Sequence, residues 1–214
     1  MRKLNVNFLK TVKGDTPVRE LSVMMDTIDR EGIGICPWPH LFNYKPKVSF
    51  AIAYTDDCIF LKYYVKEHFV LAKYLHTNDL VYEDSCVEFF VAFNGESDYY
   101  NFEFNCLGTC LAGFGETRET RKLLPKNIIE KIRYCYIIKK EQEQAETEWE
   151  LMLVIPLEVF CHHRLSGLKG QKCTGNFYKC GDHLPQPHFL SWAAIQSPEP
   201  NFHLPEFFGE IRFV

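Results

Sequence analysis

The sequence predicts an all-β protein, a two-sheet antiparallel β-sandwich with little helix. Aromatic residues make up 15% of the 214 residues, with 18 Phe and 11 Tyr. About ten short apolar runs follow one another at close spacing, and polar or proline-containing turns separate them. Apolar residues make up 46% of the chain. This is enough for a full hydrophobic core, so we expect one domain over residues 1–214.

The first predicted element is a β-hairpin. Residues 48–54 alternate large and small side chains, which is the period of a half-buried strand. Residues 58–65 resume the apolar run after a short polar turn. In that turn Asp56 and Asp57 are expected to form capping hydrogen bonds with the backbone.

The same pattern predicts seven further strands, at residues 86–93, 99–105, 132–138, 148–155, 176–180, 188–192 and 209–213. Helix is expected over residues 117–131, which have the best helical spacing, and in one short turn at 156–160 that begins with proline. The polar stretch 139–148 is interpreted as a solvated hairpin loop.

Charge and hydropathy exclude several classes of partner. The formal net charge is -4, from 24 basic and 28 acidic residues. It provides no broad positive field for nucleic acid or for an anionic membrane. No apolar run is long enough to span a bilayer. The first twenty residues lack the apolar core of a secretory signal, which predicts a cytoplasmic protein. A secreted or periplasmic chain that had lost its signal peptide would look the same.

Two segments carry a family resemblance. The first is 82–93 (YEDSCVEFFVAF), followed by the aromatic strand YYNFEFN. The second is 175–213, which contains GNFYKCGD, HFLSW and the closing PNFHLPEFFGEIRF. In their order and spacing, residues 45–213 resemble carbohydrate-binding module family 9. The resemblance implies a β-sandwich with a site at one end, where two aromatic rings clamp a sugar and polar side chains bind its hydroxyls.

Carried over position by position, the clamp residues are Tyr82 and Phe202, where members of the family carry tryptophan. The polar positions are Glu88, Glu103, Asn105, Lys179 and Asp182. The family usually has an arginine at the position of Glu103. A carboxylate accepts hydrogen bonds where a guanidinium donates them, so the ligand is expected to differ. The family's N-terminal Trp motif is replaced by Cys-Pro-Trp-Pro at 36–39.

The residue types support this interpretation and leave alternatives open. A sugar presents apolar C–H faces and a rim of hydroxyls, so its site needs flat aromatic surface beside hydrogen-bonding groups. Tyr82 and Phe202 lie in loops that can expose a ring, although each can equally pack on the rim of the core. Lys179 near either glutamate would form an ion pair that orients the acceptors.

The predicted function is therefore non-catalytic carbohydrate binding. The first alternative is a glycoside-processing enzyme that uses Glu88 and Glu103 as its carboxylate pair. The second is a protein-interaction module whose aromatic tip binds another protein. No hydrolase motif or phosphate-binding loop supports an enzyme.

No metal site or cofactor is predicted. The nine cysteines are odd in number and scattered, as expected of reduced thiols. Cysteine and histidine occur together at 161–163 and 173–183, but the spacing is not that of a zinc finger. Ca²⁺ bound by Asp56 and Asp57 is the alternative, since metal sites occur in the resembled family, although adjacent acids in a tight turn commonly only cap it.

Overall fold

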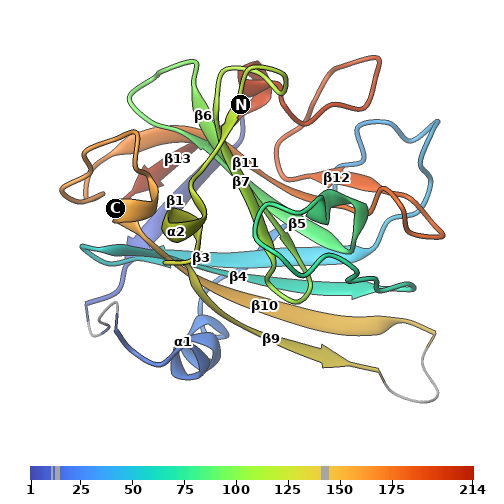
Figure 1. Cartoon of the computed structure of the whole chain (residues 1–214), viewed down its shortest axis with the longest axis horizontal. Helices are drawn as coiled ribbons and strands as arrows, with labels where there is room; N and C mark the ends of the chain where they lie inside the picture. The colour runs from blue at the N-terminus through green and yellow to red at the C-terminus, as the bar shows by residue number, and fades with distance from the viewer. Residues whose placement is uncertain (11, 13–14, 141–144) are drawn as a thin grey trace.

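The computed structural model describes residues 1–10, 12, 15–140 and 145–214, and in this part most of the regular secondary structure is β-strand (Figure 1). The strands are β1 Lys3–Phe8, β2 Glu31–Gly32, β3 Lys47–Tyr54, β4 Cys58–Glu67, β5 Cys86–Ala92, β6 Tyr99–Asn105, β7 Cys110–Gly115, β8 Lys122–Leu123, β9 Arg133–Lys139, β10 Thr147–Pro156, β11 Lys172–Cys180, β12 Phe189–Ser191 and β13 Gly209–Phe213. The helices are α1 Val18–Met25, α2 Lys126–Ile129 and the single turns η1 Val81–Glu83, η2 Leu157–Val159 and η3 Pro205–Phe207. The predicted all-β class is confirmed.

The strands form one continuous curled sheet in the order β8-β7-β6-β5-β11-β13-β1-β3-β4-β10-β9. Strand β1 joins its two halves, because residues 3–6 pair with β13 and residues 7–8 pair with β3. Both of these pairings are parallel, whereas the neighbours on either side pair antiparallel. The prediction was two separate antiparallel sheets. The structure differs from it at β1, which pairs in parallel with a strand of each half and so connects them.

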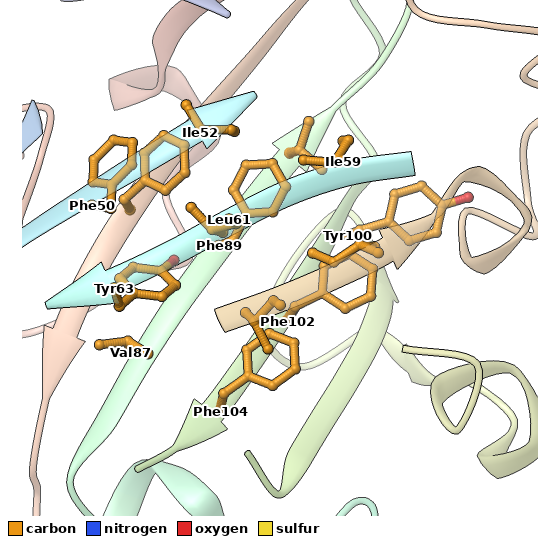
Figure 2. Close-up of a cluster of buried hydrophobic side chains, with 14 of the residues drawn as sticks. Phe50, Ile52, Ile59, Leu61, Tyr63, Val87, Phe89, Tyr100, Phe102 and Phe104 are labelled. Atoms are coloured by element: carbon orange, nitrogen blue, oxygen red, sulfur yellow. The ribbon is translucent and has the colours of Figure 1, made fainter. Parts of the chain in front are cut away.

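The core lies where the inner faces of the two halves meet (Figure 2). The ring of Phe177 in β11 stacks on Phe50 of β3 at 3.9 Å and on Phe89 of β5 at 5.0 Å, measured between centroids. Around them the apolar side chains of β3 and β4 face those of β5 and β6: Ile52, Ile59, Leu61, Tyr63, Val87, Tyr100, Phe102 and Phe104. The alternate residues of β5, β6 and β11 point to the opposite, outer face.

The long predicted strands are found within a few residues of their expected bounds, and the short helical turn expected at 156–160 occurs as η2, Leu157–Val159. The helix expected over residues 117–131 is wrong in most of its length. Only Lys126–Ile129 of the segment 117–131 is helical, after Pro125, and residues 122–123 pair as β8. Helix α1 was not predicted. Its Leu21 and Met25 are buried against the outer face of the β3–β4 half. None of the helices in the described ranges is long and apolar enough to cross a bilayer.

The turn expected between β3 and β4 occurs, but the hydrogen bond at Asp57 comes from a side-chain hydroxyl rather than from the backbone. At the β3–β4 turn the Thr55 hydroxyl donates to Asp57 Oδ1 at 2.8 Å. The predicted loop 139–148 connects β9 to β10, and its residues 141–144 lie outside the described residues.

Candidate functional site

A small cavity opens on the outer face of β5, β6 and β11. Its volume is about 210 Å³. In the antiparallel ladder Glu88 of β5 lies directly opposite Glu103 of β6, and Cys180 ends β11 on the same face. The loops that follow β7, β11 and β12 complete the walls with Arg118, Arg121, Asp182, Pro200, Asn201, Phe202 and His203.

The two glutamates form a buried carboxyl pair at the floor of the cavity. Glu88 is 3% exposed and Glu103 is 2% exposed. Burial raises the pKa of Glu88 well above its ordinary value, and the neighbouring Glu103 raises it further. Burial also raises the pKa of Glu103 to about 7, against the opposing effect of Arg121, whose Nη2 lies 3.5 Å from Glu103 Oε1. Both carboxyls are thus held where water is largely excluded.

Among the described residues, two buried carboxylate oxygens at the cavity have no hydrogen-bond partner. Asn101 Nδ2 donates to Glu103 Oε1 at 2.9 Å, but Glu103 Oε2 has no hydrogen-bond partner among the described residues. The same holds for Asp182 Oδ1 within the described ranges, and burial raises the pKa of Asp182 to about 6. A buried acceptor without a donor is costly. A ligand that brings hydroxyl or cationic donors would satisfy both oxygens.

Arginine and histidine form the opposite wall. Arg121 Nη1 donates to His203 Nε2 at 2.6 Å, and the Tyr99 hydroxyl lies 2.8 Å from His203 Nδ1. Burial, together with Arg121 and Arg118, lowers the pKa of His203 to about 2. The imidazole is therefore neutral and helps to hold the Arg121 guanidinium beside Glu103.

The two predicted clamp residues both line the cavity, but they differ in burial. Tyr82 is half-buried, and its carbonyl accepts a hydrogen bond from the backbone N–H of Asp182 at 3.2 Å. Phe202 is only 7% exposed and stacks on Tyr178 at 4.1 Å. The expectation of a ring exposed at a loop tip is wrong for Phe202. Phe189 also lines the cavity and meets Phe202 edge to face at 5.7 Å.

Two of the seven sequence-predicted residues do not line the cavity. Asn105 Oδ1 accepts from the backbone N–H groups of Leu107 and Thr109, and its Nδ2 donates to Asp84, so it orders the turn after β6. Lys179 lies on the core face of β11, because it is adjacent to the outward-facing Cys180. It pairs with Glu67 at 2.9 Å, so the expected ion pair with Glu88 or Glu103 is wrong.

The sequence interpretation missed several cavity residues: Arg118, Arg121, Cys180, Phe189 and His203. Arg118 and Arg121 fall in the segment interpreted as helix, whereas the chain there is an irregular loop that returns to β7. A His next to Phe202 in a proline-bounded loop was the only local signal for His203. The contacts that bring these side chains to the cavity are long-range, and no local pattern reports them.

The chain is thus an all-β protein with a small, partly aromatic cavity on one face of its sheet. The sequence model of carbohydrate-binding family 9 matches residues 18–213. The match covers most of the chain, and the chain belongs to this family. No curated protein matches the chain.

Solved structures with the same fold include close and distant relatives. A Bacteroides uniformis protein, described as a candidate carbohydrate-binding protein, is 37% identical with a TM-score of 0.92, over 100% of this chain and 99% of its own. A family 9 module from Caldicellulosiruptor kristjanssonii in complex with glucose is 13% identical with a TM-score of 0.61, over 100% of this chain and 96% of its own. A family 9 module from the same organism in complex with cellotriose is also 13% identical with a TM-score of 0.61, over 99% of this chain and 93% of its own.

Proposed function

We propose that the chain is a non-catalytic carbohydrate-binding domain, one β-sandwich over residues 1–214, whose sugar binds in the cavity between Tyr82 and Phe202. The observation that carries the proposal is that residues far apart in the sequence come together at one cavity. Five residues carried over from the family pattern line one cavity, although they come from separate segments: Tyr82, Glu88, Glu103, Asp182 and Phe202. Family membership and the sugar complexes of the distant relative support the same class of ligand.

The chemistry of the walls suits a sugar. The rings of Tyr82 and Phe202 offer apolar surface to C–H faces. The unpartnered oxygens of Glu103 and Asp182 accept hydroxyl hydrogens, and Arg121 donates to hydroxyl oxygens. The volume of about 210 Å³ is below that of pockets enclosing drug-sized ligands, so we expect one sugar ring to enter.

The departure at Glu103 bears on which sugar binds. Where the family usually has a guanidinium on this strand, the chain has a carboxylate. Arg121 brings a guanidinium within 3.5 Å of it from another segment. The cavity thus combines a donor and an acceptor where the family usually has a donor. We expect a ligand with a different hydroxyl pattern from that of the distant relative.

Tyr82→Ala tests the site directly. A glycan array with the purified chain first identifies a ligand, and titration calorimetry then measures its Kd. Loss of the ring should weaken binding by about 1–3 kcal/mol, or roughly five- to 150-fold. The melting temperature should change by only a few degrees, since Tyr82 is half-buried.

The matched control is Tyr136→Ala, a tyrosine on β9 that is 47% exposed and does not line the cavity. It should leave the Kd unchanged. Equal affinities of the Tyr82 and Tyr136 variants would rule out the proposed site. Failure of the array to find any glycan would rule out the proposed function.

The enzyme alternative uses the same carboxyl pair and is tested separately. Opposed glutamates on neighbouring strands are close enough for acid and nucleophile roles in a glycosidase. Here, however, Glu88 Oε1 accepts a hydrogen bond from the Cys180 thiol at 3.1 Å, and both glutamates are almost wholly buried. We therefore expect no turnover of a panel of aryl glycosides. A measurable rate that vanished in both Glu88→Gln and Glu103→Gln would establish the enzyme instead.

A further inference from the structure

Two thiols and a carboxylate meet on the outer face of β5 and β11, where Glu88 and Cys180 line the cavity and Cys86 lies beside them. One sulfur or oxygen atom from each of Cys86, Glu88 and Cys180 lies within 4.8 Å of the others, and all three residues are buried. The ladder explains the cluster. Cys86 of β5 lies directly opposite Cys180 of β11, and Glu88 is two residues further along the same face of β5. The cluster is therefore fixed by the register of two central strands rather than by mobile loops.

A neighbouring group indicates that a ligand belongs at this cluster. Glu103 lies directly opposite Glu88 on β6, is 2% exposed and lines the same cavity. Its Oε2 atom is without a hydrogen-bond partner in the described part of the chain. The Arg121 guanidinium contacts the other oxygen of Glu103, with Nη2 at 3.5 Å from Oε1. A cation beside Glu88 would lie next to this unpaired acceptor and offset its desolvation.

We propose that Cys86, Glu88 and Cys180 bind one thiophilic divalent cation, represented by Zn²⁺. In a tetrahedral site with Zn–S bonds of about 2.3 Å the two sulfurs lie roughly 3.8 Å apart, which the 4.8 Å cluster allows with small side-chain rotations. Two sulfur ligands favour Zn²⁺ over Ca²⁺ or Mg²⁺, which prefer oxygen. On binding, each thiol forms a metal–sulfur bond and releases its proton to solvent, which breaks the hydrogen bond from Cys180 to Glu88. Glu88 binds through an oxygen as the carboxylate, and any proton that it carries is released to solvent as well.

The geometry leaves the fourth position of this cation open. Glu88 and Cys180 both line the cavity, so the position opposite the strands faces the cavity. Water, the Glu103 carboxylate or a hydroxyl group of a bound ligand can occupy it. The cation site does not require the sugar, so it goes beyond the proposed function and is tested without any glycan.

The test measures metal content. The full chain is kept reduced with a phosphine, stripped with a chelator, incubated with excess Zn²⁺, desalted and analysed for zinc by mass spectrometry. We expect one zinc per chain. Substitution with Co²⁺ should produce sulfur-to-cobalt charge-transfer absorption, which a site made of carboxylates alone would not show. A zinc content far below one per chain, or cobalt binding without these bands, overturns the proposal.

Variants localise the site. Cys180→Ser and Glu88→Gln should each weaken zinc binding at least about ten-fold, the loss caused even by changes outside the direct ligands. Glu88→Gln keeps the shape of the side chain, and a thermal melt shows that the variant is folded. Cys173→Ser is the matched control, because Cys173 is a buried cysteine of the same strand on the core face. Equal zinc content in all variants, or a native Cys86–Cys180 disulfide found after thiol blocking, contradicts the site.

Discussion

Replacing Lys179 with methionine is expected to lower the free energy of unfolding by about 3–5 kcal/mol, because it leaves an uncompensated charge in the interior. Lys179 and Glu67 are both 0% exposed, and Lys179 Nζ lies 2.9 Å from Glu67 Oε2. The Lys179 ammonium donates hydrogen bonds to Cys180 O at 2.7 Å and to His188 Nε2. Its contact with the Glu67 carboxylate is an ion pair. Without it, the Glu67 carboxylate keeps the hydrogen bond from Trp149 Nε1 and the neutral His188 ring, whose Nε2 lies 3.5 Å from Glu67 Oε2, but no cation of comparable proximity among the described residues.

Urea denaturation and thermal melts measure this effect. For a chain of this size each kcal/mol corresponds to about 2–4 °C, so the melting temperature should fall by roughly 6–20 °C. Lys131→Met, which removes a surface ion pair with Glu158, should cost less than about 1 kcal/mol. Adding Glu67→Gln to Lys179→Met should recover part of the loss, since neither of these two positions then carries a charge. A Lys179 variant as stable as the Lys131 variant would show that the buried pair is not a major contribution.

Phe202→Ala should affect folding and binding together. Its ring packs on Tyr178 at 4.1 Å, Phe189 at 5.7 Å and Trp38 at 5.9 Å between centroids. Removing a buried phenylalanine of this kind costs about 3–5 kcal/mol. The same ring lines the cavity, so the Kd for the sugar should also rise. Thermal melts and calorimetry on the same sample separate the two effects.

Phe202→Leu distinguishes packing from stacking. Leucine keeps apolar volume in the cluster but offers no flat ring to a sugar. We expect it to recover most of the stability lost in Phe202→Ala while binding stays weak. A Phe202→Ala protein that melted within a few degrees of the parent would show that the ring is peripheral. A Phe202→Leu protein with unchanged affinity would remove Phe202 from the sugar site.

The parts of the fold that local pattern determines were predictable from sequence. The hairpin of β3 and β4 has period-two alternation and a polar turn, and both strands occur as expected. Strand β1 was missed although Leu4, Val6 and Phe8 alternate with polar residues in its sequence, KLNVNF, because the run is short and the polar residues between them are asparagines, which are uncommon in strands. Its pairing partners lie at the opposite end of the chain and in β3, which no local pattern indicates.

The candidate site was predictable only in part, for a similar reason. The family pattern places Glu88, Glu103 and Asp182 at one cavity. The alternation of side chains along a strand places Lys179 on the core face of β11. A buried lysine is not expected there until its partner Glu67 is known, and the sequence does not show that pairing. Arg121 reaches Glu103 through a loop with no regular structure, so its position depends on tertiary packing alone.

The position of β13 has a consequence for how the protein can fail. This strand lies between β1 and β11, near the middle of the sheet order. If Gly209–Phe213 detached, the N–H and C=O groups of residues 3–6 and 172–175 would lose their partners at the same time. Two unsatisfied edges would then open inside the sheet rather than at its rim. Such edges are templates for pairing with other chains, so intermolecular aggregation is the expected result when β13 unfolds locally.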